Sequence, residues 1–243
     1  MTVTVGRRTL LLLIAGLVVV GVIGVGGYLF LFGGSDAPPP AELSGTGEQA
    51  GDDGANEPAG IDGNWQVVAG ETSDPTFVGY RVSETLLGVN RRNEAVGRTN
   101  EVQGTVTITG TTVEAVELTA NLETLQSDET RRDTALRSRG LEIDEFPTAT
   151  FTLTDPIDLG QLPSAGQAVN VTAVGELTLH GVTSDVSVPL EAVLVAGSTP
   201  QIEIVGSLEI SMADFEIEPP NVGGVVSVDD RGTLELHVFL ERA

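Results

Sequence analysis

Apolar and polar residues alternate along most of the second half of the chain. Between residues 169 and 195, two alternating runs flank Gly181, with valine and leucine at one set of positions and Asn170, Glu176 and Asp185 at the other. A period of two places successive side chains on opposite faces of a β-strand. These runs therefore predict a long antiparallel hairpin with one apolar face and one solvated face.

The same alternation recurs on both sides of this hairpin. Strands are predicted at residues 65–68, 77–82, 102–109, 113–122, 148–153, 202–210 and 234–240. About eight strands with one apolar face must either pack against a second sheet or close on themselves to hide their edges. Closure is the smaller assumption, so we predict an all-β fold, an eight-stranded antiparallel barrel. Such an interior is just wide enough to be filled by side chains or to hold one small ligand.

Two stretches depart from the alternation. Residues 84–100 are polar and irregular, and no strand is predicted there. Residues 127–140 suit a short helix, with Ser127 or Asp128 as its N-cap and Gly140 just past its end. Only Ala135 and Leu136 are candidates for burial in it. We therefore expect the helix to lie over an opening or an edge of the barrel.

The amino-terminal part predicts a membrane anchor. Residues 9–32 carry no charge and are long enough to cross a bilayer as a helix, while Arg7 and Arg8 precede them. The positive-inside rule then places residues 1–8 in the cytoplasm and the rest outside, in a single-pass protein of the cell membrane. A cleaved signal peptide is the alternative, but bulky residues occupy positions 28–32, where a small-residue cleavage site would lie.

Residues 33–63 separate this anchor from the predicted folded domain, residues 64–242. They are rich in proline, glycine and acidic residues, with too little apolar surface to form a core. We expect a disordered linker, and a flexible coil of about 28 residues reaches roughly 30 Å. The folded domain is therefore expected to work close to the membrane.

Charge and composition exclude several classes of function. The chain has 35 acidic and 12 basic residues, all of the latter arginine, and a formal net charge of -23. This charge argues against nucleic-acid binding. Because the chain contains no cysteine, disulfides, thiolate zinc sites and thiol nucleophiles are excluded. No motif indicates a cofactor.

Three segments carry a resemblance to a known family. They are RRDTALRSRGLEIDEFPTATF at residues 131–151, GELTLHGVTSDVSVPL at residues 175–190 and SMADFEI at residues 211–217. In this order and spacing they resemble the YceI-like family of polyisoprenoid-binding, lipocalin-like barrels. The resemblance implies an elongated apolar cavity that takes up a long-chain isoprenoid or similar amphiphile outside the cytoplasmic membrane.

The candidate ligand-binding residues are the larger apolar side chains on the inward rows of the predicted strands and around the helix. The alternative is that they only pack against one another. Aromatic residues make up only 4% of the chain, and small inward side chains leave room for a tunnel. The candidates are Phe77, Leu118, Leu122, Leu136, Phe146, Phe151, Leu177, Leu179, Val186, Ile204, Leu208 and Phe215.

A cluster of arginines offers a candidate head-group site. Arg131 and Arg132 are the main candidates, and they could attract an anionic head group or the membrane surface. The same hypothesis extends to Arg91, Arg92, Arg98 and Arg137 as a ring at the cavity mouth. The alternative is charge pairing on the surface of a strongly acidic domain.

Catalytic and metal sites are not predicted. His180 with Asp185 could suggest a hydrolase, but no nucleophile motif accompanies them, so a histidine that stabilises the turn is favoured. His237 faces outward by its parity, and no metal-binding spacing is present. The acidic residues near the helix are interpreted as a cap and a solvated face. The leading hypothesis is a lipid carrier, and the alternatives are an envelope hydrolase and a cell-envelope adaptor.

Overall fold

The computed structural model describes residues 37–44, 60–86, 91–195, 199–219 and 225–243. Residues 37–243 belong to one compact unit. The predicted cytoplasmic tail and membrane span, residues 1–32, lie outside the described residues. Within the described part of the chain, no helix is both long enough and apolar enough to cross a bilayer.

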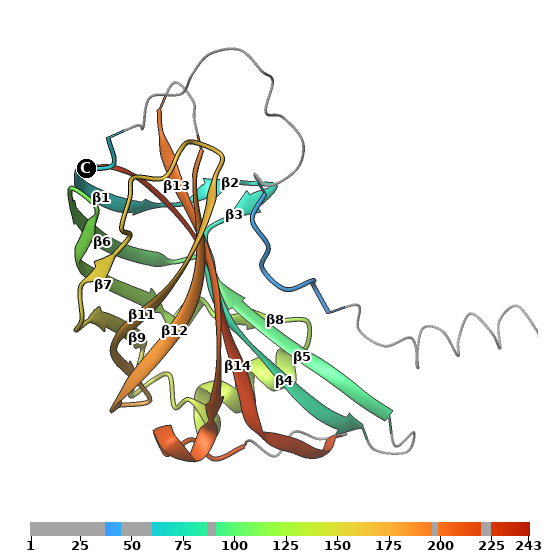
Figure 1. The fold of residues 1–243 in the computed structure, drawn as a ribbon. Helices are drawn as coiled ribbons and strands as arrows, with labels where there is room; N and C mark the ends of the chain where they lie inside the picture. Colours follow the sequence, from blue (N-terminus) through green and yellow to red (C-terminus); the bar gives the residue numbers. More distant parts are fainter. Residues whose placement is uncertain (1–36, 45–59, 87–90, 196–198, 220–224) are drawn as a thin grey trace, which may run out of the picture. The chain divides into compact units, whose positions relative to one another are not determined.

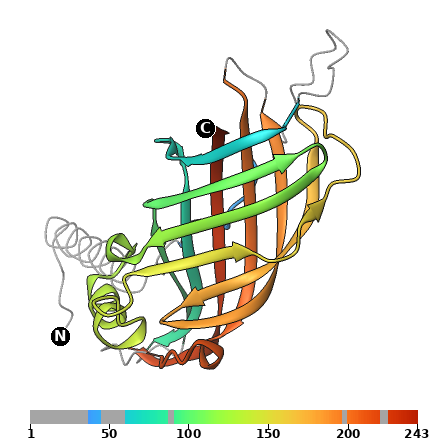
Figure 2. The same ribbon diagram turned by 90° about the vertical axis from the view of Figure 1, so that its left-hand side faces the viewer.

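Eight antiparallel strands close into a barrel, as the alternation predicted (Figures 1 and 2). Each strand pairs with the next around the ring, and β1 pairs with β14 to close it. In spatial order the strands are β1 (Gly63–Val68), β6 (Val102–Thr109), β7 (Thr112–Asn121), β9 (Thr148–Leu153), β11 (Ala168–Leu179), β12 (Val182–Val195), β13 (Gln201–Ser211) and β14 (Val225–Arg242).

The longest strand, β14, pairs with β13 along one edge and with two strands along the other. Residues 239–242 of β14 pair with β1, whereas residues 225–237 pair with β4 (Phe77–Leu86). Beyond β4 the sheet continues into β5 (Arg91–Thr99) and β8 (Gln126–Ser127). The expectation that residues 84–100 are irregular was therefore wrong, because β5 is held along its length by backbone pairing with β4. Three strands of two residues complete the sheets: β2 (Gly70–Glu71) and β3 (Asp74–Pro75), which pair with each other, and β10 (Ile157–Asp158), which pairs with β7.

The predicted long hairpin is present as β11 and β12. Their register runs without interruption from Ala168 opposite Val193 to Leu179 opposite Val182. The two turn residues, His180 and Gly181, both have positive φ, 53° and 73°. Two-residue turns of this handedness match the twist of the flanking strands.

The short helical segments gather at one end of the barrel, at the bottom of Figure 1 and at the lower left and bottom of Figure 2. They are η1 (Leu122–Thr124), α2 (Thr130–Ala135), η2 (Leu136–Gly140) and η3 (Met212–Phe215). The N-cap of α2 is Glu129, whose carboxylate accepts from the Arg131 amide, and not Ser127 or Asp128 as predicted. We refer to this end of the barrel as the helix end.

The core is divided along the barrel axis. At the end opposite the helices, Trp65 is fully buried and packs with Ile61, Val106, Ile108 and Leu240. The indole Nε1 of Trp65 also donates to the Ile61 carbonyl at 2.8 Å. A second apolar cluster lines the helix end around Leu122, Leu179, Ile210 and Phe215. The lumen is therefore packed at one end, and the remaining space lies toward the helices.

Candidate functional site

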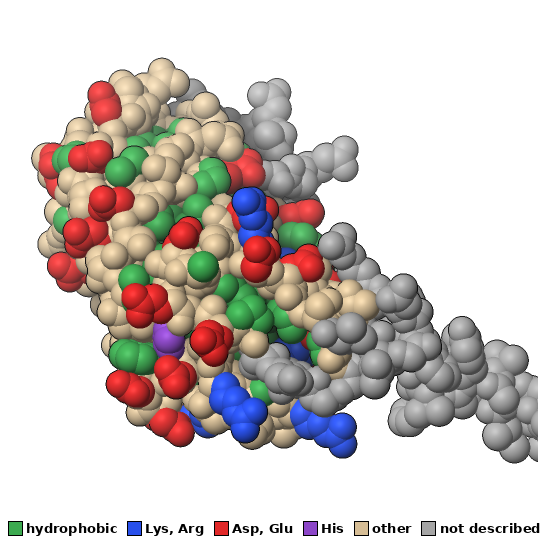
Figure 3. All heavy atoms as spheres, turned by 90° about the horizontal axis from the view of Figure 1, so that it is seen from below, with side chains coloured by type: hydrophobic (Ala, Val, Ile, Leu, Met, Phe, Trp, Pro, Cys, Tyr) green, Lys and Arg blue, Asp and Glu red, His purple; other side chains and the backbone are tan. Residues whose placement is uncertain are grey.

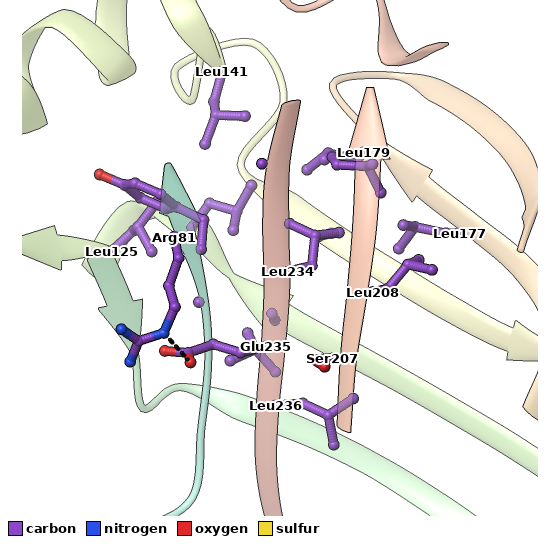
Figure 4. Close-up of a pocket in the computed structure, with 18 of the residues that line it drawn as sticks. Arg81, Leu125, Leu141, Leu177, Leu179, Ser207, Leu208, Leu234, Glu235 and Leu236 are labelled. Carbon is purple, nitrogen blue, oxygen red and sulfur yellow. Dashed lines mark hydrogen bonds and ion pairs between the residues drawn. The ribbon is translucent and has the colours of Figure 1, made fainter. Parts of the chain in front are cut away.

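An apolar cavity of about 230 Å³ occupies the helix half of the barrel. This volume is far above the ~10–15 Å³ that one buried water needs. Leucine side chains from several strands converge on it, among them Leu177, Leu208 and Leu234 (Figure 4). Apolar side chains also reach the surface at this end, between acidic and basic ones (Figure 3). A space of this kind can hold an apolar chain without any specific polar contact.

The structure brings eight of the twelve predicted wall residues together around this cavity. That they contact a ligand stays a prediction. They come from five strands, η1 and η2, so residues far apart in the sequence meet in one wall. The eight are Leu118, Leu122, Leu136, Phe151, Leu177, Leu179, Val186 and Leu208.

The other four predicted wall residues do not line the cavity. Phe77 lies on the outer face of the sheet, where its ring meets His237 at 5.7 Å between ring centroids. Phe146 packs against His180 at the β11–β12 turn, with 4.9 Å between ring centroids. Ile204 packs against the Trp65 cluster. Phe215 is buried in the core at the helix end.

The two head-group candidates have different environments. Arg131 is exposed and does not line the cavity, whereas Arg132 is 7% exposed and does. Arg132 reaches across from α2 to β4, where its Nη2 donates to Glu84 Oε1 at 2.8 Å. Its Nη1 donates to Asp128 Oδ1 at 2.5 Å and to Ser127 Oγ at 3.2 Å. Arg132 is thus the buried member of the pair that was predicted.

The wider arginine ring does not form as expected among the described side chains. Arg98 lies on the outer face, where it donates to Glu235 and stacks 3.9 Å above the Phe77 ring. Arg137 pairs at 3.4 Å with the exposed Asp144. The side chains of Arg91 and Arg92 lie outside the described set.

His180 is held by two structural partners. Its Nδ1 lies 3.0 Å from the Phe215 carbonyl and its Nε2 lies 3.0 Å from Glu142 Oε2. The ring therefore joins the β11–β12 turn to η3 and to the loop after η2. Asp185, its suggested partner, instead sits opposite Glu176 on the exposed face of the hairpin. This geometry fits the turn-stabilising role that the sequence favoured.

A segment of the predicted linker packs against the outside of the barrel. Residues 37–44, which we call the strap, were expected to be disordered. Leu43 is 8% exposed and packs against Val193 and Val205 on the outer face. The Ser44 amide and hydroxyl donate to the two oxygens of Glu203, at 2.7 and 2.9 Å. Farther along, the carbonyls of Pro38 and Pro39 accept from arginines.

Beneath the strap and the β2–β3 hairpin lies a buried polar cluster that the sequence did not predict. His237 does face outward, as its parity indicated, but it is only 3% exposed. Its Nε2 lies 2.8 Å from Glu203 Oε1, and its Nδ1 lies 3.4 Å from Asp74 Oδ1. The signal that could have revealed it is the apolar Phe239 beside His237 on the polar face of β14.

This cluster has donor atoms that a metal ion could use. In the described part of the chain, Asp74, Glu203 and His237 form the group whose ligand atoms lie within 4.8 Å of one another. However, the two ring nitrogens of His237 face different carboxylates, and both oxygens of Glu203 accept from Ser44. A metal ligand needs a free lone pair aimed at a shared point. We interpret the group as a hydrogen-bonded clasp between strap, hairpin and barrel.

The clasp gives a pH prediction. Burial acts to raise the pKa of Glu203, but the hydrogen bonds from His237 and Ser44 outweigh it and lower this pKa below 4.5. A lowered folded-state pKa contributes stability that is complete above the unfolded pKa and is lost as the pH falls through the folded one. In urea titrations below pH 4.5, we expect the unfolding free energy of the wild type to fall more steeply than that of Glu203→Gln.

The matched control for this measurement is Glu209→Gln. Glu209 is on the same strand, its side chain is 64% exposed, and it pairs with an exposed arginine. Its profile should follow the wild type. Parallel profiles for the wild type and Glu203→Gln would contradict the assignment.

The comparisons with known proteins agree with this geometry. The YceI-like domain family matches residues 66–240. A UPF0312 protein of Vibrio vulnificus is 33% identical over 128 residues, which cover 51% of this chain and 60% of the relative. A UPF0312 protein of Vibrio campbellii is 32% identical over the same shares. The matched region thus spans about 60% of the length of these curated relatives.

Solved structures share the fold at low sequence identity. A polyisoprenoid-binding domain from Saccharophagus degradans, implicated in plant cell wall breakdown, superposes with a TM-score of 0.57 at 20% identity. This match covers 74% of the present chain and 98% of that domain. The YceI protein of Campylobacter jejuni gives a TM-score of 0.50 at 17% identity, over 60% of this chain and 84% of that one.

Proposed function

Because the chain belongs to the YceI-like domain family, we propose that its barrel binds a long-chain isoprenoid or a similar amphiphilic lipid. It acts as a carrier or buffer and makes or breaks no bonds. The observation that carries the proposal is the apolar cavity of about 230 Å³ in the helix half of the barrel. The polyisoprenoid-binding domain of Saccharophagus degradans, which shares the fold, supports the same class of ligand.

Burial of hydrocarbon supplies enough free energy for such binding. One buried CH₂ contributes about 0.8 kcal/mol, so a five-carbon isoprene unit contributes roughly 3 to 4 kcal/mol. Three buried units therefore approach about 10 kcal/mol before the costs of ordering are subtracted. The packed cluster around Trp65 closes the far end of the lumen. A longer chain must then leave its remaining units outside the cavity.

We further propose that the barrel works at the outer surface of the cytoplasmic membrane, anchored by residues 9–32. The strap supports a short tether between the predicted membrane span and the barrel, because residues of the strap already contact the barrel. Residues 33–36 span at most about 14 Å when fully extended. This is shorter than the roughly 30 Å expected of a flexible linker of about 28 residues. A short tether favours transfer of a lipid directly from the membrane.

The test is the lipid content of the purified protein. The full chain is purified in detergent, extracted with organic solvent and analysed by mass spectrometry. We expect an isoprenoid or related lipid in near-stoichiometric amount, retained through repeated detergent washes. A protein that is folded by circular dichroism but carries no lipid, and takes none up from added membranes, would contradict the proposal.

A further inference from the structure

The wall of the cavity contains two buried polar atoms without a hydrogen-bond partner. Tyr80 Oη and Arg132 Nε are both inaccessible to solvent, and neither makes a hydrogen bond of normal geometry with the residues that the structure describes, although Ser127 lies near enough to the Tyr80 hydroxyl to act on its pKa. Both residues line the cavity. A buried donor that is left unsatisfied destabilises the folded protein. Two of them in one largely apolar wall leave room for a ligand atom as the missing partner.

The charge of Arg132 is already balanced. Its two terminal nitrogens are committed to Glu84, which is 3% exposed, and to Asp128. Burial acts to lower the pKa of Arg132, but the hydrogen bonds to Glu84 and Asp128 outweigh it and raise this pKa, so the side chain stays protonated. One guanidinium thus faces two carboxylates. A further negative group at this point would be repelled by them.

The charges around the cavity are balanced in the same way. Arg132 and Glu84 pair with each other inside it, whereas Arg81 and Glu235 border the cavity but pair on the outer face, where Arg81 also contacts the strap. Arg81 Nε is bonded to Glu235 Oε2 at 2.7 Å, as the dashed line in Figure 4 marks. No excess positive charge is therefore available in the wall to hold a phosphate.

Tyr80 supplies the second donor. Burial raises the pKa of its hydroxyl, which therefore stays protonated. Ser127 lies next to both side chains, because Arg132 Nη1 donates to its Oγ at 3.2 Å and the same residue acts on the Tyr80 hydroxyl. An O–H and an N–H on one wall both suit the lone pairs of a single oxygen.

We propose that Tyr80 and Arg132 form a polar subsite that binds the uncharged oxygen head group, an alcohol or a carbonyl, of the lipid in the cavity. The subsite rests on the proposed function, because the apolar chain of the same ligand occupies the cavity. The subsite also explains why Arg132 lies in the cavity wall although the ligand carries no negative charge. The selectivity is the reverse of the expectation that the arginines attract a phosphorylated lipid.

The test uses three probes with the same fifteen-carbon chain: farnesene, farnesol and farnesyl phosphate. Their affinities are measured by calorimetry for the full chain and for Tyr80→Phe, in the same non-ionic detergent. Partition into micelles is equal for both proteins and cancels in their ratio. One hydrogen bond corresponds to about a fivefold change in affinity. Tyr80→Phe should therefore weaken farnesol about fivefold and leave farnesene unchanged.

Tyr80→Phe should also remain folded. The substitution keeps the ring and removes only a hydroxyl that makes no hydrogen bond of normal geometry in the described structure. Its melting temperature should equal or exceed that of the wild type. A loss of farnesol binding therefore cannot be attributed to unfolding.

A second variant tests the charge argument. Asp128→Asn removes one of the two carboxylates from Arg132 at a side chain that is 48% exposed. It should increase the affinity for farnesyl phosphate severalfold and leave farnesol within about twofold. Equal farnesol binding by Tyr80→Phe and the wild type overturns the subsite. If none of the three probes binds the wild type, the proposed function itself fails.

Discussion

Leu208→Trp should remove lipid from the purified protein and leave the barrel folded. Leu208 points into the cavity beside Leu177 (Figure 4), and both line it. An indole at this position occupies the space that the ligand chain needs. We expect co-purified lipid and farnesol affinity to fall by more than tenfold, which corresponds to about 1.4 kcal/mol. Mass spectrometry of the organic extract measures the first and calorimetry the second.

The stability of this variant separates a cavity from a packed core. Filling an existing cavity is neutral or stabilising, whereas overpacking a filled core costs typically 1–3 kcal/mol. The control is Glu209→Trp, the next residue on β13, whose side chain is 64% exposed. It should retain lipid at the wild-type level. If Leu208→Trp unfolds at a lower temperature and still carries lipid, the ligand does not lie in this cavity.

The parts of the barrel that were predicted from sequence share one property, an apolar face turned to the lumen. Residues 148–153 were predicted as a strand and form β9 with those limits. The β11–β12 hairpin was located with its turn at Gly181. In each case, burial of one face requires apolar residues at every second position. This alternation is sufficient to predict the strand from sequence.

β5 was missed because it is held in place differently. It lies beyond the closed ring, and its nine positions pair with β4 through the backbone. Its first four residues are polar or charged, and the buried Ala95 and Val96 are adjacent instead of alternating. Backbone hydrogen bonds leave no signature in side-chain type, so no pattern marked this strand.

The prediction of cavity-lining residues failed where other parts of the chain also cover the outer face of the barrel. Phe77 was placed inside, but its neighbour Val78 lines the cavity, and Phe77 lies on the outer face, where it contacts the His237 ring and the Arg98 guanidinium. A strand with apolar residues on both faces gives no parity signal. His237 and Arg98, which cover Phe77, lie on other strands, so these contacts could not be derived from the local sequence pattern.

Contacts between residues far apart in the sequence could not be predicted either. Arg132 was considered as a surface or mouth residue, yet it is buried because Glu84, 48 positions earlier, accepts its hydrogen bond. The strap likewise depends on Arg81, Arg98 and Glu203, which belong to three different strands. The composition of residues 37–44 predicts that they cannot form a core of their own. It does not show that a partner surface exists elsewhere in the chain.

Glu235→Ala should be among the most destabilising single substitutions in the barrel. The Glu235 side chain is 2% exposed, and its two oxygens accept from Arg81 Nε at 2.7 Å and Arg98 Nε at 2.8 Å. Removing it leaves the guanidinium of Arg81, which is 9% exposed, without its most buried partner. Breaking a buried pair from one side costs about 3–5 kcal/mol. Urea unfolding measures the loss.

Glu209→Ala is the matched control, because it removes a glutamate–arginine pair whose side chains are 64% and 68% exposed. Exposed pairs contribute at most about 1 kcal/mol. If both variants lose the same free energy of unfolding, the buried Glu235 cluster contributes no more to stability than an exposed ion pair.

The same substitution tests whether the ion cluster holds the strap. Arg81 and Arg98, which Glu235 orients, also donate from their Nη2 atoms to the carbonyls of Pro38 and Pro39, at 2.6 and 2.7 Å. When the carboxylate is removed, both guanidinium groups lose the contact that fixes them, so the strap should detach under conditions where the barrel is still folded. Hydrogen exchange of the Ser44 amide, which donates to Glu203, should then accelerate in Glu235→Ala and not in Glu209→Ala. Unchanged protection of Ser44 would mean that Leu43 and Glu203 suffice to hold the strap, and that the arginines only neutralise the carboxylate between them.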